Sequence, residues 1–311
     1  MESMQLDQRL RCRTTPVLLL SIAAGSAGAQ DMEPRPYTNV PIGTNFFLVG
    51  YAHSTGGLST NPASAIQDAR LTVRSPFIAY ARAFSAWGQS AKFDAVLPVG
   101  SLSGSALVNG VPVTREISGL ADPSFRVSLS LAGAPALSLS EFASYRQDLI
   151  TGVSVQVTAP LGQYDPNRLV NLGTNRWMLR PEIGFSKAIG RVRLEAGLSV
   201  SLFTTNHDYY GGSTLEQNPL YSGRANLVYQ FDSGVWMALN GTYYSGGRTR
   251  LDGVLRDDLV QVSRIGATLT LPIDRKNSFK FSLADGVTVR TGNTDFRILG
   301  LTWQHRWGAG L

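Results

Sequence analysis

Residues 191–204 read RVRLEAGLSVSLFT, and the alternation in this stretch decides the fold class. Apolar residues occupy every second position: Val192, Leu194, Ala196, Leu198, Val200 and Leu202. Because successive side chains of a strand point to opposite faces, the stretch predicts a strand with one apolar and one polar face. It is long, since strands of soluble proteins usually have about five or six residues. A tilted strand that crosses a bilayer needs about nine to eleven.

The same alternation recurs from residue 43 onward. We count twelve such segments, which begin near Thr44, Leu71, Ala91, Ser124, Leu149, Arg176, Arg191, Tyr221, Val235, Leu259, Ser278 and Asp295. Short turns such as 232–234 alternate with long polar loops such as 205–220, as in outer-membrane barrels. The sequence therefore predicts an all-β protein, a transmembrane antiparallel up-and-down β-barrel of about twelve strands. An even number suits a single-chain bacterial barrel, with its short turns in the periplasm.

Composition agrees with a barrel. Charged residues make up 16% of the chain, against about 25% in a typical soluble domain. No apolar run approaches the roughly 18 residues that a membrane-spanning helix needs. These two observations leave a secreted all-β protein or a membrane barrel, and the length of the strands favours the barrel.

The N-terminus has the form of an export signal. Three arginines up to Arg13 precede an apolar run at 17–24, and Ala27-Gly28-Ala29 supplies small residues for cleavage. We expect cleavage after Ala29, so residues 1–29 are a signal peptide, 30–42 an N-terminal periplasmic segment and 43–311 an outer-membrane β-barrel. The only cysteine, Cys12, would be removed, which excludes disulfides from the mature chain. The expected location is the outer membrane of a Gram-negative bacterium, reached with the barrel-assembly machinery.

The formal net charge of the whole chain is +6. Its basic residues are scattered singly through alternating segments and do not cluster on one helix. We therefore expect them to line the barrel, and we expect no nucleic-acid partner. The expected partners are outer-membrane lipid and a small-molecule solute, and the expected state is a monomer.

One connection on the short-turn side is long, residues 132–148. Within it, residues 138–146 predict a short helix, with Ser138 as N-cap and Glu141 completing a capping box. The segment lies across the periplasmic mouth, folds inward as a plug, or is a surface helix with no gating role. The sequence leaves these alternatives open.

If the apolar positions face lipid, the polar register faces the lumen. The predicted lumen-lining residues are Arg82, Lys92, Asp94, Arg126, Gln156, Arg176, Arg180, Glu182, Arg193, Glu195, Arg224, Asn226, Asn240, Arg264, Lys280, Gln304 and Arg306. Unpaired charges in a narrow lumen are costly, so some arginines should pair with Asp94, Glu182 and Glu195. The surplus of cations predicts a positive interior that favours anions. Aromatic acids suit such a lumen, with Tyr80, Tyr244 or Tyr210 beside the ring. Alternatively, the charged residues simply fill a narrow barrel.

Catalytic patterns are weak. His53-Ser54 is the one adjacent His and Ser pair, and neighbouring strand residues point to opposite faces. Asp252, Asp257 and Asp258 do not have the spacing of a calcium loop. We expect no catalytic residue, no metal site and no cofactor.

Several motifs resemble a known family. They are PIGTNF at 41–46, GY at 50–51, YDPNR at 164–168, NLGTNRW at 171–177, DYYGG at 208–212 and QNPLY at 217–221. Together they resemble the outer-membrane transporter family named for the meta-pathway of phenol degradation. The resemblance implies a channel of the kind often encoded near aromatic-degradation genes. It also singles out an extracellular loop motif: Tyr164, Asp165, Pro166, Asn167, Arg168, Asn171, Gly173, Asn175 and Trp177.

The expected function is passive uptake of small organic solutes, aromatic or anionic, through an outer-membrane channel. The alternatives are a closed barrel with a structural or surface-interaction role and, further off, a lipid-active barrel enzyme. The sequence does not name the solute or say whether the lumen is open.

Overall fold

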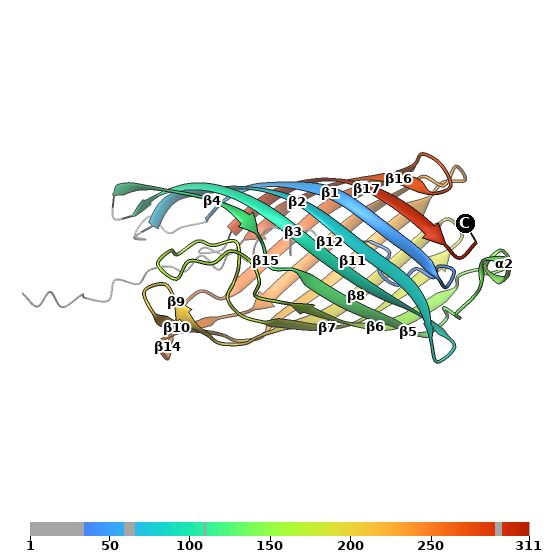
Figure 1. Ribbon diagram of the computed structural model, residues 1–311, viewed down its shortest axis with the longest axis horizontal. Coiled ribbons are helices and arrows are strands. Elements are labelled where there is room, and N and C mark those ends of the chain that lie inside the picture. The colour runs from blue at the N-terminus through green and yellow to red at the C-terminus, as the bar shows by residue number, and fades with distance from the viewer. Residues whose placement is uncertain (1–33, 59–65, 109, 290–293, 311) are drawn as a thin grey trace, which may run out of the picture.

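Twelve antiparallel strands close into a barrel in the computed structural model, which describes residues 34–58, 66–108, 110–289 and 294–310 (Figure 1). The strands are β1 (Thr44–Leu58), β2 (Ile66–Ala86), β3 (Gln89–Val108), β5 (Ser124–Ala132), β6 (Leu149–Thr158), β7 (Met178–Ile189), β8 (Val192–Phe203), β11 (Leu220–Gln230), β12 (Trp236–Gly246), β15 (Val260–Pro272), β16 (Asn277–Val289) and β17 (Thr294–Gly308). Pairing of β1 with β17 closes the barrel. Each of the twelve strands predicted from the sequence is present, within five residues of its expected start.

Five further strands lie outside the twelve. β4 (Val111–Leu120) pairs with the C-terminal half of β3, residues 99–108. β9 (Asn206–Tyr209), β10 (Ser213–Gln217), β13 (Thr249–Leu251) and β14 (Val254–Leu255) form a separate four-stranded sheet. They occupy segments that the sequence analysis assigned to polar loops. We call this end of the barrel the long-loop end, and the opposite end, where the turns are short, the short-turn end (Figure 1).

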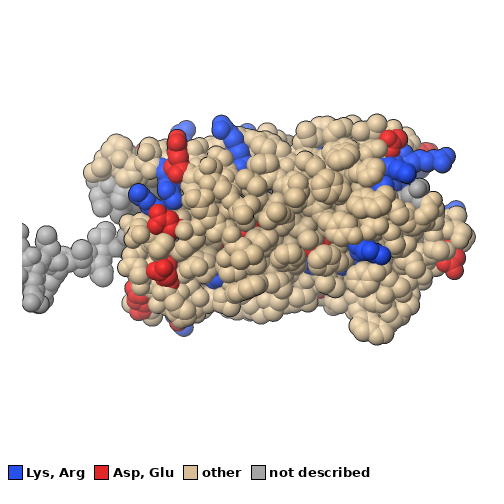
Figure 2. All heavy atoms as spheres, viewed as in Figure 1, with Lys and Arg blue, Asp and Glu red and all other residues tan. Residues whose placement is uncertain are grey.

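The outer face of the barrel is apolar between two charged ends. In β8, Leu194, Leu198 and Leu202 are all exposed. On the face shown in Figure 2, charged side chains gather toward the two ends and leave the middle largely uncharged. Trp303, His305 and Trp307 stack outside the wall, with ring centroids about 6 Å apart, near the short-turn end. An apolar band edged by aromatic rings is the exterior of a barrel that sits in a membrane.

The long connection at the short-turn end contains the one helix of the described chain, α2 (Leu139–Phe142). Its N-cap is Ser138, and both bonds of the predicted capping box are present. The helix is shorter than the expected 138–146. No helix among the described residues is long and apolar enough to cross a membrane.

The interior has an apolar side near the long-loop end. Inward side chains of β2, β3, β16 and β17 form a cluster with Leu172, which comes from the loop between β6 and β7: Leu71, Val73, Leu102, Leu172, Ala284, Phe296 and Ile298. Leu172 is 1% exposed. Gly100 makes room for it, since a Cβ there would lie 2.6 Å from a Leu172 methyl carbon. The long loop thus folds into this half of the barrel as well as over it.

Candidate functional site

The inward register of the strands contains most of the predicted lumen residues. Sixteen of the seventeen face the interior or its mouths: Lys92, Asp94, Arg126, Gln156, Arg176, Arg180, Glu182, Arg193, Glu195, Arg224, Asn226, Asn240, Arg264, Lys280, Gln304 and Arg306. All except Arg176, which precedes β7, come from ten of the twelve barrel strands, and none comes from β1 or β2.

Arg82 is the exception, and its predicted inward position is wrong. It pairs opposite Asn45, in the same register as the exposed Phe47 and Ile78, so it points outward. The inward register of this part of β2 is taken by small residues such as Ala81 and Ala83, which are buried. An arginine near the end of a strand can lay its aliphatic stem along the wall and keep its charge in water.

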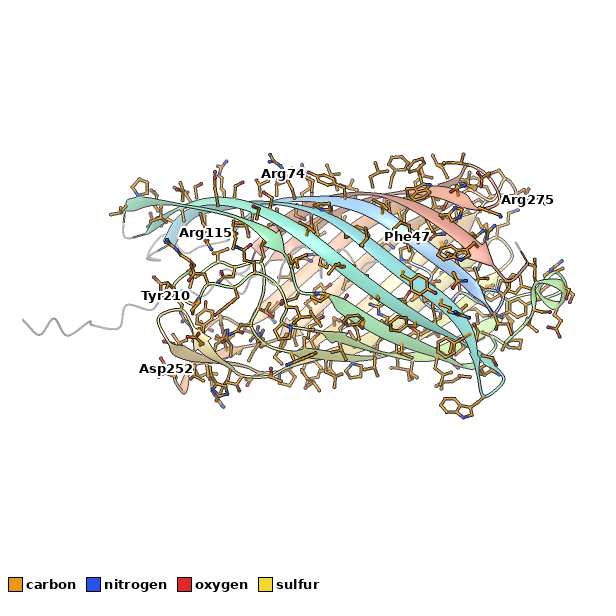
Figure 3. The ribbon with its side chains drawn as sticks, viewed as in Figure 1. Phe47, Arg74, Arg115, Tyr210, Asp252 and Arg275 are labelled. Carbon is orange, nitrogen blue, oxygen red and sulfur yellow. The ribbon has the colours of Figure 1, made fainter. Side chains whose placement is uncertain are left out.

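The three tyrosines proposed as ring partners lie in different places. Tyr80 is outside the barrel, where its hydroxyl donates to Asn45 Oδ1 at 2.7 Å. Tyr210 is exposed at the long-loop end (Figure 3). Tyr244 is buried in the lumen, with the Arg264 guanidinium carbon 5.6 Å from its ring centre.

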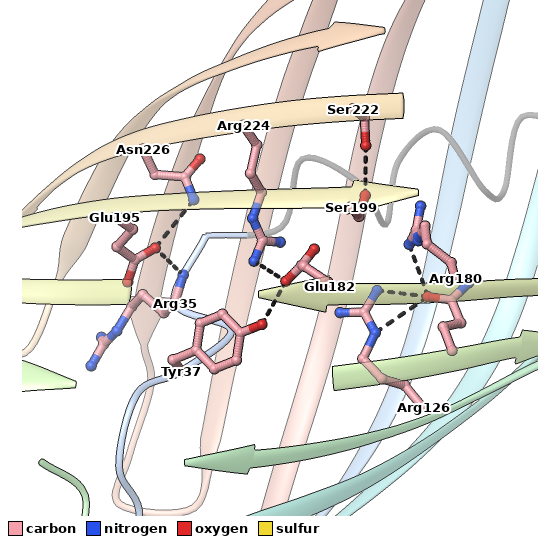
Figure 4. A network of polar contacts seen from close by, with 11 residues as sticks. Arg35, Tyr37, Arg126, Arg180, Glu182, Glu195, Ser199, Ser222, Arg224 and Asn226 are labelled. Atoms are coloured by element: carbon pink, nitrogen blue, oxygen red, sulfur yellow. Dashed lines mark hydrogen bonds and ion pairs between the residues drawn. The ribbon is translucent and has the colours of Figure 1, made fainter. Parts of the chain in front are cut away.

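A buried polar network covers the inner wall from β7 to β12, and Figure 4 shows its part from β7 to β11. Glu182 accepts a hydrogen bond from Arg224 Nη2 at 2.6 Å, and both side chains are less than a tenth exposed. Glu195 accepts from Asn226 Nδ2 at 3.1 Å. Asn226 in turn accepts from Asn240 Nδ2 at 3.0 Å. Buried polar groups of this kind stabilise a structure only when they are bonded to one another, and these are.

The expected pairing of an arginine with a lumen acid is found for Glu182, which pairs with Arg224. Asp94 has a lysine instead, with Lys92 Nζ 3.5 Å from its Oδ1. Glu195 accepts from an amide, a backbone N–H and the Ser186 hydroxyl.

Two arginines converge on one neutral oxygen at the wall formed by β5, β6 and β7. Arg126 donates to Gln156 Oε1 from Nε at 3.2 Å and from Nη2 at 2.7 Å. Arg180 donates to the same oxygen from Nη2 at 2.9 Å (Figure 4). An amide oxygen positions the two guanidinium groups but does not neutralise their charge. The two guanidinium groups thus lie together on this wall, where Asp94 is the register partner of Arg126.

Residues 34–42 lie inside the barrel, which the sequence did not indicate. Tyr37 is 3% exposed, and its hydroxyl donates to the inward Glu182 at 2.8 Å. The backbone N–H of Arg35 donates to Glu195 Oε2 at 2.7 Å. Toward the short-turn end, the N–H of Ile42 donates to the carbonyl of Leu137. The chain thus runs along the inner wall before it enters β1.

Two adjoining cavities occupy the lumen. One, of about 620 Å³, opens at the short-turn end, where Phe142, Tyr145 and Arg146 of the α2 connection line it. The other, of about 330 Å³, lies deeper. Its walls combine apolar side chains with charged ones: Phe46, Leu48, Phe77 and Val96 on one hand, Arg35, Lys92, Asp94, Arg126 and Lys280 on the other. Eight of the described residues line both cavities: Arg35, Thr38, Val40, Leu48, Trp236, Lys280, Thr302 and Gln304.

The loop motif forms an ordered, hydrogen-bonded structure at the long-loop end. Asn171 is its centre, since its amide accepts from the N–H of Asp165 at 3.1 Å and donates to the carbonyls of Asp165 and Arg168. Asn167 closes the turn by donating its N–H to Asp165 Oδ1 at 2.9 Å. Gly173 is needed for a close approach, because a Cβ there would lie 2.6 Å from the carbonyl oxygen of Gly162.

The same motif ties the loop to the four-stranded sheet. Tyr164 donates its hydroxyl to the carbonyl of Asp208 at 2.9 Å. The carbonyl of Pro166 accepts from the N–H of Gly211. Asn175 Nδ2 donates to Asn206 Oδ1 at 3.0 Å, whereas Trp177 is half exposed beside the wall. The family motifs therefore hold the rim together.

Arg176 is buried under this rim. Its Nη2 donates to Gln217, and its guanidinium carbon lies 4.6 Å from the ring centre of Phe203. Burial lowers the pKa of Arg176 to about 10. Since the cation is desolvated and bonded to a neutral amide, it adds positive potential at the long-loop end of the lumen.

The described residues offer little for catalysis. His53 and Ser54 face opposite sides of β1, with Ser54 buried and His53 only partly so. The His305 ring lies outside the barrel between two tryptophans. Among the described residues, no group of three or more His, Cys, Asp or Glu side chains could hold a metal ion.

Comparison with solved structures shows the fold. The COG4313 outer membrane channel from Pseudomonas putida F1 has a TM-score of 0.75 at 22% identity, over 88% of this chain and 99% of that one. The transport unit of the autotransporter AIDA-I from Escherichia coli gives 0.54 at 8% identity, over 88% and 92%. The β domain of the Bordetella autotransporter BrkA gives 0.51 at 8%, over 85% and 100%. No curated protein matches the chain.

Comparison with protein families identifies the group. The model of one family, described as the putative MetA-pathway of phenol degradation, matches residues 56–304. That range runs from β1 to β17 and contains the loop motif as well as most of the lumen residues. The chain therefore belongs to the family of the putative MetA-pathway of phenol degradation, and it has the fold of an outer-membrane channel.

Proposed function

We propose that this protein is an outer-membrane channel for the passive uptake of small organic solutes, aromatic or anionic. The observation that carries the proposal is the deeper cavity, which combines an apolar wall with an excess of cations. Its volume, about 330 Å³, falls in the range of sites for small organic ligands.

The charges favour a solute with a carboxylate. Among the described residues that line the deeper cavity, four are basic, Arg35, Lys92, Arg126 and Lys280, and one is acidic, Asp94. Basic side chains that line a pore favour anions, and low-dielectric walls strengthen the effect. Apolar side chains such as Phe46 and Phe77 provide a surface for the hydrocarbon part of the solute. An aromatic acid has both features.

A second candidate function, a closed barrel with a structural or surface role, is favoured by what occupies the interior. Leu172 seals an apolar cluster at the long-loop end, and residues 34–42 fill part of the lumen. Passage through the barrel must go around these two obstructions. The two functions differ in one measurable property, which is ionic current.

Conductance in planar bilayers separates them. We expect discrete channel events with a preference for anions, and uptake of benzoate-like solutes into liposomes. An intact barrel by circular dichroism that gives no channel events would remove the transport proposal. Reversing the charge of lumen residues, with Arg180→Glu and Arg264→Glu, should weaken or reverse the anion preference. Arg74→Glu is the matched control, because Arg74 points away from the lumen (Figure 3).

The expected processing and assembly can be tested in the same preparation. Residues 1–29 and the cleavage site after Ala29 lie outside the described residues. N-terminal sequencing of protein from outer membranes should begin at Gln30, and the detergent-solubilised protein should have the mass of a monomer. A full-length N-terminus in the outer membrane would contradict the signal-peptide assignment.

A further inference from the structure

Three glycines leave part of the inner wall without side chains, and one side chain of the N-terminal segment packs there. Gly152, Gly184 and Gly197 are register partners on β6, β7 and β8, and all three face the lumen. We call them the glycine row. The Tyr37 ring lies on it, because a Cβ at Gly152 would be 2.5 Å from Tyr37 Cδ1, and one at Gly184 would be 2.7 Å from Cε2. Any larger residue at these two positions would displace the ring.

Polar contacts hold the ring at this patch. The hydroxyl of Tyr37 donates to Glu182 at 2.8 Å, and the same carboxylate oxygen accepts from Arg224 at 2.6 Å. The Arg224 guanidinium carbon lies 6.0 Å from the centre of the Tyr37 ring. Apolar area, hydrogen bond and cation thus converge on one side chain, as in Figure 4. A chain segment that only passed through the lumen would not need such a seat.

The seat determines where Arg35 lies. Its guanidinium carbon is 5.4 Å from the ring centre of Trp236, and its Nε donates to Thr38 Oγ1 at 3.3 Å. Both Arg35 and Trp236 line the shallow and the deep cavity. The carboxylate of Glu195 is near, and it accepts a hydrogen bond from the backbone N–H of Arg35 at 2.7 Å. The Arg35 cation therefore lies where the two cavities adjoin.

We propose that residues 34–42 are the selectivity element of the channel, with Tyr37 as the anchor and Arg35 as the charge that the solute must pass. The proposal rests on the proposed transport function and assigns its selectivity to the N-terminal segment. Arg35 attracts the carboxylate of a solute between the cavities, and the Trp236 ring stacks beside it. The segment also narrows the lumen, because it occupies part of the cross-section.

Single-channel recordings of two variants test the anchor. Tyr37→Ala removes the anchoring side chain, and Gly152→Ala keeps it but fills its seat. We expect both to raise the single-channel conductance, about twofold or more, because a released segment leaves a wider path. The matched controls are Tyr243→Ala, at an outward and exposed tyrosine that lines neither cavity, and Gly241→Ala, where an added Cβ meets nothing within 4 Å. Circular dichroism and heat-dependent gel mobility verify that each barrel has folded.

The charge is tested separately. Arg35→Gln should lower the ratio of anion to cation permeability while it changes the conductance little. A single cysteine at Thr38, which lines both cavities, provides a second measurement that does not depend on the anchor. Modification of Thr38→Cys by a charged methanethiosulfonate reagent should reduce the current.

The outcomes separate this proposal from the function on which it rests. Wild-type conductance and selectivity in Tyr37→Ala, Gly152→Ala and Arg35→Gln would overturn the proposal and leave transport standing. Current through Tyr37→Ala together with a silent wild-type protein would show that the segment closes the lumen, which would overturn both its role in selectivity and passive uptake through the wild-type barrel. Silence of the wild type and of every variant would overturn both. Unchanged current after complete modification of Thr38→Cys, verified by mass, would also overturn the selectivity element.

Discussion

Replacing Glu182 by Gln should remove one charge of a buried ion pair while it keeps an acceptor oxygen for Tyr37. The side chains of Arg224 and Glu182 are 6% and 9% exposed, and they meet at 2.6 Å. Loss of one partner from a buried pair leaves the other charge uncompensated, which costs about 3–5 kcal/mol. We expect Glu182→Gln to lower the free energy of unfolding by the lower end of that range, about 3 kcal/mol, because the amide oxygen of Gln can still accept from Arg224 and Tyr37.

A second pair in the same barrel provides the matched control. Arg297 and Asp285 meet at 2.7 Å, nearly the same distance, but their side chains are 64% and 42% exposed. Exposed pairs contribute about 0–1 kcal/mol, so Asp285→Asn should change stability little. The measurement is reversible urea unfolding of the protein in lipid vesicles, followed by tryptophan fluorescence. If Glu182→Gln loses no more stability than Asp285→Asn, burial of the lumen network does not have the energetic role that we assign to it.

Three further predictions concern the ends of the barrel. Gly133→Ala should lower the free energy of unfolding by about 1–3 kcal/mol or more, because the residue has φ +82° and a Cβ would meet a backbone carbonyl oxygen at 1.8 Å. Asp122→Asn should speed hydrogen exchange at the amide of Thr174, which donates to Asp122 Oδ2 at 2.8 Å. The hydrogen bonds from Ser138 lower the pKa of Glu141. The carboxylate therefore stabilises α2 above the unfolded-state pKa, and protection of the Ser138 amide should be lost as the pH falls through the folded-state pKa.

Each of the three has its own control. Gly190→Ala, at φ +61° with open space around the Cβ position, should cost less than Gly133→Ala in the same unfolding experiment. Equal losses would mean that the carbonyl contact is unimportant. In the exchange experiment, amides of β8 should be unaffected by Asp122→Asn, and unchanged exchange at Thr174 would contradict the predicted anchoring. For α2, Glu141→Gln should remove the pH step, and a step that persists would assign it to another group.

The strands and the inward register could be predicted because, in a membrane barrel, apolar residues that face lipid alternate along each strand with polar residues that face the lumen. The predicted register is wrong where the inward residues are not polar and the outward residues are not apolar. In β2 the inward positions are alanines such as Ala81, and the outward positions near the short-turn end include Arg82. Hydropathy alone reverses these faces, although the aromatic Tyr80 and Phe84 in the phase of Arg82 are a signal that could have corrected it.

The contents of the lumen could not be predicted, for a different reason. Residues 34–42 form no strand, so they carry no periodicity, and their position depends on the glycine row more than a hundred residues away in the sequence. The insertion of Leu172 likewise depends on space at Gly100. In both cases a glycine on one strand accommodates a side chain from a remote segment. The match between such a glycine and its remote side chain can be recognised only once the positions of the strands in the barrel are known.

The pairing of β1 with β17 has a consequence for the order of assembly. Thr44 pairs with Gly308, so the first and last strands of the barrel meet only after nearly the whole chain has been synthesised and exported. Contacts between such distant residues make folding slow, because a very long loop must close before they form. Residues 34–42 immediately precede β1 and contact β7 and β8, so they must reach the glycine row before this seam closes or thread in afterwards. If β1 pairs with β17 first, the barrel closes without residues 34–42 in its lumen. The rate of this pairing, relative to the rate at which the segment packs on the glycine row, would then determine the fraction of molecules that contain the segment.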